Sequence, residues 1–131
     1  MLSIHSLFKR KKDPLADVRF IDIDETDSTS NYIKSILATL DGVEEEPRMI
    51  VAYADYQTAG RGQGNNTWES ERGKNLLFSV CCHPVWVPVT SQFVISKAVA
   101  LALRDSLAEY TSDITIKWPN DIYWRDCKIS G

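Results

Sequence analysis

Residues 60–64 combine residue types that could hold an anion. They read Gly60-Arg61-Gly62-Gln63-Gly64. Glycines let backbone N–H groups approach an anion closely, and the arginine adds a planar, permanently charged fork, so the segment suits a phosphate or an activated carboxylate. No Gly-Lys-Ser/Thr closes it as in a Walker loop, and its spacing differs from the dinucleotide fingerprint. Taken alone, the segment is also what a plain flexible loop would look like.

A second segment, residues 117–121, could contribute a cation and metal-binding oxygens. It reads Lys117-Trp118-Pro119-Asn120-Asp121. A lysine that ends a strand can place its ammonium group at the mouth of a pocket, and Asn120 and Asp121 offer oxygens of the kind that Mg²⁺ prefers. The plain alternative is a strand that ends in an ordinary turn, with Lys117 exposed to solvent.

A third polar segment, residues 27–31, lies between an expected strand and an expected helix. It reads Asp27-Ser28-Thr29-Ser30-Asn31. Hydroxyl groups at the start of a helix can cap its free N–H groups or hydrogen-bond a neutral polar ligand. Capping alone is the simpler interpretation.

The elements that would position these segments follow from the spacing of apolar residues. Strands are expected over 18–23, 49–56, 75–82 and 114–118, with shorter strands starting at 123 and 128. Two helices are expected from apolar stripes: Ile33, Ile36, Leu37 and Leu40 in the first, and Ile95, Val99, Leu103, Leu107 and Tyr110 in the second. Gly42 would end the first helix before a polar linker, residues 44–47. Thr90 would cap the second, with Val89 packed on Val94.

Helices and strands are interspersed in this order, and the last two strands look like a hairpin. This favours an α+β fold, a mixed sheet covered by helices, over a doubly wound parallel sheet. Between the second and third strands, residues 57–74 form a long loop with four glycines, and such loops are often functional. We expect this loop to be mobile without ligand and to order when ligand binds.

Composition restricts the class of protein. With 131 residues, 44% of them hydrophobic and 25% charged, the chain has the profile of a globular domain with one core. A net charge of −3 disfavours nucleic acid as the main partner, and no apolar run is long enough to cross a membrane. Cys81, Cys82 and Cys127 lack metal-ligand spacing, so we expect buried thiols in a reducing, cytoplasmic compartment.

Taken together and in this order, the polar segments closely resemble those of biotin–protein ligases. The resemblance runs from about Phe20 to Gly131, and the pairing of Ala-Gly-Arg-Gly with Lys-Trp-Pro-Asn-Asp at this separation is highly specific. It is carried by residues 27–31, 56–62, Trp68, 117–121 and 128–131.

The resemblance implies a fold, a reaction and partners. The fold would be the class II aminoacyl-tRNA synthetase-like α+β fold of biotin and lipoate ligases. The reaction would be adenylation of biotin, the substrate, by ATP with Mg²⁺, followed by transfer of biotin to a lysine. That lysine would belong to the biotin carboxyl carrier protein of acetyl-CoA carboxylase or a related carboxylase. Neither nucleic acid nor membrane would be a partner, and a homodimer is a possible assembly.

The same resemblance implies roles for individual residues. The ureido head and ring of biotin would be bound by Ser28, Thr29, Ser30 and Gln57. The biotin carboxylate and the phosphate would be held by Arg61 and by the backbone of Gly60, Arg61, Gly62 and Gln63. Trp68 would cover the adenine, and Asn120 would lie near the phosphates, with Asn120 and Asp121 as candidate Mg²⁺ ligands. Lys117 would contact the activated carbonyl, which makes Arg61 and Lys117 the expected catalytic residues.

The chain departs from the family pattern in two ways. Many relatives have a second arginine where this chain has Gln63 and a basic residue where it has Gly64, so the loop here is less cationic. In the family, residues 128–131 are followed by more sheet and a small C-terminal domain. We therefore expect a tail over 1–17, the N-terminal part of the catalytic domain over 18–131, no N-terminal DNA-binding domain, and an isolated chain that is inactive and poorly stable.

Two other functions compete with this one. A lipoate–protein ligase-like enzyme would share the fold and the adenylate chemistry, and binding assays with biotin and lipoate would separate the two. A non-catalytic ligand-binding fragment is the rival of a different class. A nucleic-acid-binding module is disfavoured by the charge.

Overall fold

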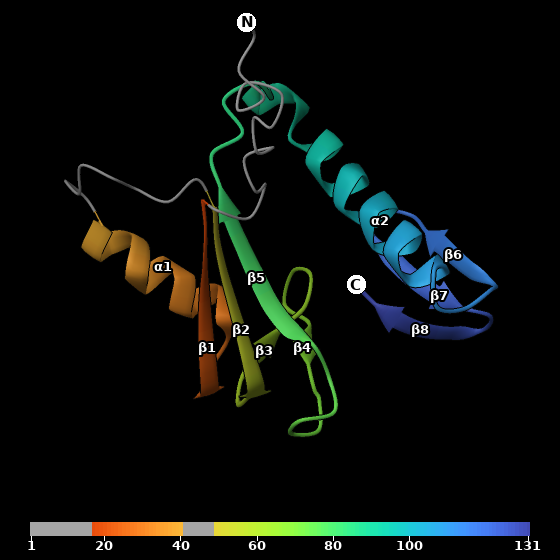
Figure 1. The fold of residues 1–131 in the computed structure, drawn as a ribbon, viewed down its shortest axis with the longest axis horizontal. Helices are drawn as coiled ribbons and strands as arrows, with labels where there is room; N and C mark the ends of the chain where they lie inside the picture. Colours follow the sequence, from red (N-terminus) through yellow and green to blue (C-terminus); the bar gives the residue numbers. More distant parts are fainter. Residues whose placement is uncertain (1–16, 41–48) are drawn as a thin grey trace, which may run out of the picture. The chain divides into compact units, whose positions relative to one another are not determined.

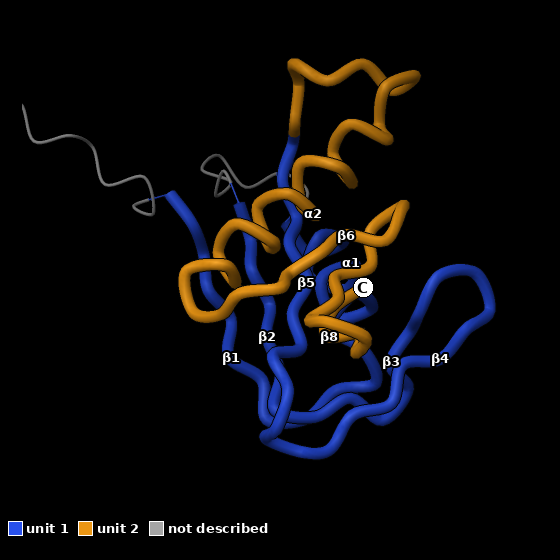
Figure 2. Tube along the Cα trace, turned by 90° about the vertical axis from the view of Figure 1, so that its right-hand side faces the viewer, with its two compact units in different colours: residues 1–83 blue, residues 84–131 orange. Residues whose placement is uncertain are grey.

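The computed structural model describes residues 17–40 and 49–131. The chain divides into two compact units, residues 1–83 and 84–131, each described here by itself (Figure 2). The expected helix stop at Gly42 and the linker over 44–47 lie outside the described residues, as does nearly all of the expected tail.

A mixed three-stranded sheet with one covering helix forms the first unit (Figure 1). Strand β1 (Val18–Thr26) runs parallel to β2 (Met49–Gln57), which pairs antiparallel with β5 (Leu77–Cys82). Helix α1 (Thr29–Leu40) packs on β2 and β5. The predicted strands, the first helix and the mixed sheet are confirmed.

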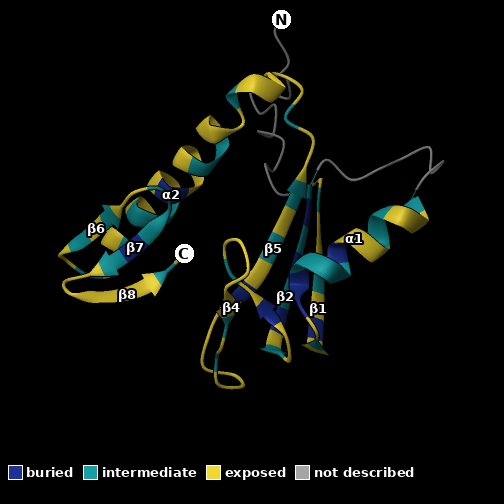
Figure 3. Cartoon of the chain, turned by 180° about the vertical axis from the view of Figure 1, so that it is seen from behind, coloured by how far each residue is buried: buried dark blue, intermediate teal, exposed yellow. Residues whose placement is uncertain are grey.

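The core of this unit lies between α1 and the sheet (Figure 3). Alternate residues of β2 face inward, and the small side chains of Ala52 and Ala54 are buried beneath the helix. Ile33 is the buried residue of the predicted helical stripe, and Leu37 packs against the same cluster. This packing fixes the N-terminus of α1 beside the C-terminal end of β2, where the candidate site lies.

The long loop between β2 and β5 contains a small hairpin that the sequence did not predict. Strand β3 (Gly60–Arg61) pairs antiparallel with β4 (Thr67–Trp68). The Gly62 N–H continues this pairing by donating to the Asn66 carbonyl at 2.8 Å. The loop is therefore organised around a hairpin whose turn spans residues 62–66.

An antiparallel meander with one helix forms the second unit (Figure 1). Strands β6 (Ile114–Lys117), β7 (Asp121–Trp124) and β8 (Cys127–Ser130) pair in chain order, which confirms the predicted hairpin. Helix α2 (Phe93–Ala108) packs on β6 and β7. Ile122, with no exposed surface, and Ala100 are the buried apolar residues of this unit.

The start of α2 differs from the prediction. A 3-10 helix (Val89–Ser91) precedes it, Gln92 is its N-cap, and no side chain caps it, so the cap assigned to Thr90 is wrong. Val89 and Val94 are both largely exposed, so the expected packing between them is also wrong. The 3-10 turn satisfies backbone groups locally, as short turns at helix ends often do.

The buried stripe of α2 matches the prediction only in part. Ile95, Leu103 and Leu107 are half-buried as expected, but Val99 is 52% exposed and Tyr110 is 86% exposed. Tyr110 lies beyond the helix, which ends at Ala108. The prediction followed the large apolar residues and missed Ala100, the one buried residue of the helix. Among the described residues, no helix is long and apolar enough to cross a bilayer.

The cysteines correct another prediction. Cys82 and Cys127 are exposed and only Cys81 is partly buried, so the expectation of three buried thiols is wrong. Burial raises the pKa of the Cys81 thiol, with a smaller contribution from the neighbouring Cys82. All three are free thiols.

Candidate functional site

Ser28 caps the N-terminus of α1 where that helix follows β1. Its side chain is buried, and its Oγ accepts a hydrogen bond from the Asn31 N–H at 3.1 Å. Its carbonyl accepts the Tyr32 N–H at 3.0 Å, the first bond of the helical ladder. The capping interpretation of residues 27–31 is confirmed at this position. Because the capping oxygen only accepts, the Ser28 hydroxyl hydrogen can still be donated elsewhere.

Asp27 reinforces this helix start with a carboxylate. One oxygen accepts the Ser28 N–H at 2.6 Å, and the other accepts the Asn31 side-chain N–H at 2.7 Å. The Asn31 side-chain bond, followed by the Ser28 backbone bond, lowers the pKa of the Asp27 carboxyl. The ionised carboxylate therefore sits where the helix dipole favours negative charge.

A partly buried polar cluster links α1 to both neighbouring strands. The Gln57 Oε1 accepts two bonds from Thr29, one from its N–H at 2.8 Å and one from its hydroxyl at 3.1 Å. The Thr29 and Ser79 hydroxyl oxygens lie 2.7 Å apart. Since Thr29 donates its single hydroxyl hydrogen to Gln57, Ser79 is the donor in that pair. The cluster ties together residues from α1, β2 and β5.

This cluster fixes which way the Gln57 amide faces. With its carbonyl oxygen saturated by Thr29, the amide presents its NH₂ group on the other side, beside Gly60. The site therefore offers hydrogen-bond donors there. The resemblance did not assign a role to Ser79. One feature of the sequence could have pointed to Ser79: it is the serine between Leu77 and Cys81 on a strand face that is otherwise apolar.

The glycines of the loop serve different structural purposes. A side chain at Gly60 would clash with the Trp68 carbonyl oxygen and would lie 2.9 Å from the Gln57 amide nitrogen. At Gly62 a Cβ would lie 3.1 Å from the Asn66 Cβ. Gly64 has open space around it but a φ of 65°, which L side chains rarely adopt. The loop thus needs glycine for close approach at position 60 and for backbone conformation at position 64.

Arg61 reaches from the hairpin to the first turn of α1. Its Nη1 donates to the Asn31 Oδ1 at 3.2 Å, and its side chain is otherwise exposed. Gln63 is exposed in the hairpin turn, and Ser30 is half-buried in the first turn of α1. Trp68 is half-buried on β4, paired with Gly60. The first unit therefore gathers every predicted site residue of residues 28–68 around one hairpin and one helix start.

Both ends of the loop are fastened to the sheet. At its start, the Thr58 and Ala59 N–H groups donate to the carbonyls of Thr26 and Asp27 at 2.9 and 2.8 Å. At its end, Arg72 pairs with Asp24, at 3.1 Å, and with Glu25, and its guanidinium lies 5.0 Å from the centre of the Tyr56 ring. These contacts lead us to expect that any opening of the loop occurs mainly in the hairpin.

Lys117, Asn120 and Asp121 lie in the second unit. Lys117 ends β6, is exposed, and has its Nζ 5.7 Å from the centre of the Tyr123 ring. Asn120 is half-buried in the turn that leads to β7. Lys117 is therefore presented at a strand end, as the sequence predicted.

The surroundings of Asp121 do not fit a divalent cation. Its Oδ1 forms an ion pair with the Lys128 Nζ at 2.9 Å, and a lysine in that position repels a metal ion. No group of three or more acidic, histidine or cysteine side chains that could hold a metal occurs in residues 17–40 and 49–131. We therefore do not assign Asp121 as a metal ligand.

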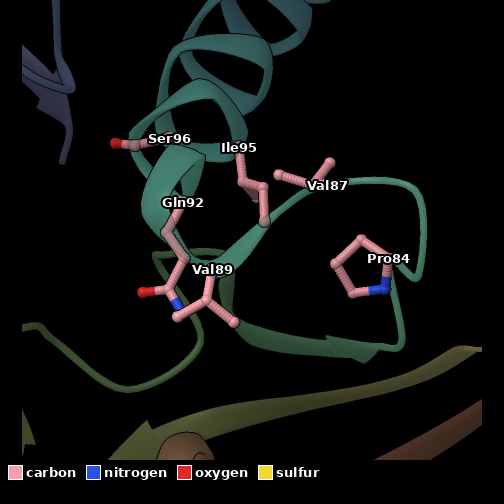
Figure 4. A pocket seen from close by; sticks show the side chains of 6 residues that line it. All are labelled: Pro84, Val87, Val89, Gln92, Ile95 and Ser96. Carbon is pink, nitrogen blue, oxygen red and sulfur yellow. The ribbon is translucent and has the colours of Figure 1, made fainter.

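A hollow of about 570 Å³ lies at the start of α2 in the second unit (Figure 4). None of the predicted site residues lines it. Its walls are mostly apolar and are formed by Pro84, Val87, Val89, Gln92, Ile95 and Ser96.

The mixed sheet, covering helix and glycine hairpin define an α+β domain of the kind found in biotin protein ligases. The structure of the biotin protein ligase from Leishmania major in complex with biotin is similar, with a TM-score of 0.67 and 26% identity over 86% of this chain and 48% of that one. A biotin acetyl coenzyme A carboxylase synthetase from Helicobacter pylori gives a TM-score of 0.64 at 25% identity, over 85% of this chain and 51% of that one.

The sequence comparison defines the family. Residues 23–131 match the biotin/lipoate A/B protein ligase family, and the chain belongs to it. It is 31% identical over 106 residues to the bifunctional ligase/repressor BirA of Escherichia coli (strain K12), covering 80% of this chain and 31% of that protein. Identity to the biotin–[acetyl-CoA-carboxylase] ligase of Mycobacterium tuberculosis is 35% over 86 residues, 63% of this chain and 32% of that protein. The chain thus spans about a third of these relatives.

Proposed function

We propose that the protein acts as a biotin–protein ligase. It activates biotin with ATP and transfers the biotinyl group to a lysine of the biotin carboxyl carrier protein of a carboxylase. The observation that carries this proposal is the partly buried Thr29–Gln57–Ser79 cluster next to the glycine hairpin with Arg61. The names of three of the similar proteins quoted above support the same substrate, since two are biotin ligases and one is a biotin acetyl coenzyme A carboxylase synthetase.

The orientation of Gln57 favours biotin over lipoate. Its free NH₂ group requires an acceptor, because a donor left unpaired when a ligand excludes water costs about 1–3 kcal/mol. The ureido ring of biotin carries a carbonyl oxygen that can accept. The dithiolane ring of lipoate has no oxygen or nitrogen to do so. The ureido group would therefore be bound by Thr29, Gln57 and Ser28, with Ser30 beside them.

The proposed chemistry needs charge stabilisation and no nucleophilic side chain. A biotin carboxylate oxygen attacks the α-phosphorus of ATP, the bond to pyrophosphate breaks, and an acyl-adenylate forms. The lysine amine of the carrier then attacks the acyl carbon, AMP leaves, and the amine loses a proton. Both reactants of the first step are anions, so Arg61, the backbone of residues 60–63 and Lys117 would lower its barrier by neutralising charge.

The remaining assignments concern the nucleotide and the compartment. Trp68 would cover the adenine, and Asn120 would lie near the phosphates. Mg²⁺ would enter with ATP, since Asp121, one of its two candidate ligands, is paired with Lys128. The free thiols suit a reducing compartment such as the cytoplasm.

The test is exchange of labelled pyrophosphate into ATP by the protein that carries this sequence. Biotin should support exchange and lipoate should not. Exchange driven by lipoate alone would refute the biotin assignment. Tight biotin binding without exchange would favour the non-catalytic alternative. A Lys34→Ala variant, altered at an exposed position of α1 outside the site, serves as the control and should match the unmodified protein.

A further inference from the structure

Asn31 stands between an ionised carboxylate and the arginine of the glycine hairpin. Its Nδ2 donates to the Asp27 Oδ2 at 2.7 Å, and its Oδ1 accepts from the Arg61 Nη1 at 3.2 Å. Only this orientation of the amide satisfies both neighbours, because Asp27 only accepts and Arg61 only donates. The three residues come from the end of β1, the first turn of α1 and β3.

The helix start holds this amide in place. The Asn31 backbone N–H donates to the Ser28 Oγ, and the Ser28 N–H donates to Asp27. The cap therefore fixes both the carboxylate and the backbone of the residue that contacts Arg61. The Asn31 backbone N–H makes the capping bond, so the Asn31 side chain takes no part in capping. The contact between that side chain and Arg61 therefore requires a separate explanation.

We propose that Asn31 is a positioning residue that holds the Arg61 guanidinium over the N-terminus of α1, ready to receive an anion. Asp27 polarises the Asn31 amide through the first bond, which strengthens the Asn31 oxygen as an acceptor for the second. The bond engages one Nη of Arg61, and the guanidinium keeps other N–H groups for a carboxylate or phosphate oxygen. This inference rests on the proposed function for the identity of that anion.

An amide suits this role better than a carboxylate or a hydroxyl. A lone carboxylate at position 31 would repel Asp27 and would bind Arg61 as an ion pair that competes with the substrate. A serine would be too short to reach both neighbours. The double variant Asp27→Asn with Asn31→Asp exchanges the two groups and preserves each bond. The amide introduced at position 27 would donate to the carboxylate introduced at position 31, and that carboxylate would still accept from Arg61.

A double-mutant cycle on pyrophosphate exchange tests the inference. Asn31→Ala should lower exchange about tenfold, the scale of one hydrogen bond to a charged group. In an Arg61→Ala background the same substitution should change exchange less than about twofold, because the residue through which it acts is gone. The exchanged pair Asp27→Asn, Asn31→Asp should restore the protection of the Arg61 guanidinium protons that Asn31→Ala loses, while its ion pair with Arg61 should keep pyrophosphate exchange low. Lys34→Ala, on the same helix, should change nothing in either background.

Two outcomes would overturn the inference. Asn31→Ala could lower exchange by the same factor with and without Arg61, which would indicate a role independent of Arg61, or it could have no effect. An unmodified protein without biotin-dependent exchange would refute the proposed function instead. In that case NMR of the Arg61 guanidinium protons still tests the contact between Asn31 and Arg61. Asn31→Ala should speed the exchange of these protons with water, whereas Lys34→Ala should not. Unchanged proton exchange would refute the contact itself.

Discussion

At the scale of single residues, the candidate site is organised by groups whose hydrogen-bonding capacity is largely used up. Ser28 and Thr29 are 2% and 3% exposed, so leaving their hydroxyls unpaired would be costly. Their bonds to α1 and to Gln57 remove this cost and leave few polar groups to face a ligand. Those that remain are mainly donors and cations, which matches an anionic substrate with a ureido group.

Arg61→Ala and Lys117→Ala should each lower adenylation by about 100-fold, the scale expected when one preorganised charge is removed from a transition state. Pyrophosphate exchange measures the effect directly. Gln63→Ala is the comparison within the hairpin, since Gln63 is exposed and uncharged, and it should cost much less. Near-normal turnover in the Arg61 or Lys117 variant would mean that the residue is only a surface charge.

Gly60→Ala and Gly64→Ala should separate the two uses of glycine in the hairpin. The added methyl at position 60 meets backbone and should disrupt the pairing of β3 with β4, whereas position 64 has room and bears only the conformational cost of a positive φ. We expect Gly60→Ala to abolish biotin binding and Gly64→Ala to weaken it about 5- to 30-fold, for a conformational cost of about 1–2 kcal/mol. Isothermal titration measures both, and equal losses would contradict this assignment.

The roles predicted for individual site residues stay predictions, and the sequence assigned none to Asn31 or Ser79. Ser79 meets Thr29 across 50 positions, and Arg61 meets Asn31 across 30. Local spacing carries no information on pairs so far apart. Both roles became visible only when the fold placed α1, β2, β3 and β5 together.

At the scale of elements, the loop between β2 and β5 is a hairpin held at both ends. The expected change from mobile to ordered therefore concerns the hairpin, residues 60–68, more than the whole of residues 57–74. Arg72 fastens the later end through Asp24, Glu25 and Tyr56. Because these contacts are partly exposed, each is worth little alone, and their value lies in acting together.

Hydrogen exchange on the protein should resolve this arrangement. Amides of residues 62–66 should exchange fast without ligand and slow with biotin and ATP, whereas the Gly73 amide, bonded to the Asp55 carbonyl at 2.9 Å, should be protected in both states. Arg72→Ala should speed exchange at Gly73, and Lys74→Ala, a nearby exposed lysine, should not. Equal protection of residues 62–66 with and without ligand would refute closure of the hairpin.

Strand and helix positions could largely be predicted from apolar spacing, and the failures have physical causes. Strands β3 and β4 are two residues long each, too short for alternation to register. Thr90 resembles a cap in sequence, but the 3-10 turn over Val89–Ser91 moves the helix start to Phe93. Ala100 contributes too little hydrophobicity to define a buried stripe.

At the scale of the whole chain, the two units divide the predicted chemistry between them. The first carries Thr29, Gln57 and Arg61, and the second carries Lys117 and Asn120. Each unit has its own sheet, helix and buried residues. Unfolding of either unit should therefore displace the predicted site residues that this unit carries.

Ile33→Ala in the first unit and Ile122→Ala in the second should each lower the free energy of unfolding of their unit by about 2–5 kcal/mol, the usual cost of truncating a buried isoleucine. Val99→Ala, at a half-exposed position of α2, is the control and should change stability by less than about 1 kcal/mol. Urea unfolding followed by circular dichroism gives the values. A cost at Ile122 no larger than at Val99 would contradict the assigned core of the second unit.

The position of Trp68 has an optical consequence. It is one of four tryptophans in the chain, and Trp86, Trp118 and Trp124 all lie in the second unit. Replacing those three by phenylalanine would leave a single tryptophan, half-buried on β4 beside Gly60, which can be excited selectively over the five tyrosines. Its emission would shift to shorter wavelength as water leaves the indole and would be quenched by a stacked adenine. Rapid mixing with biotin and then with ATP would thus record the arrival of each substrate as a separate change in light from one side chain.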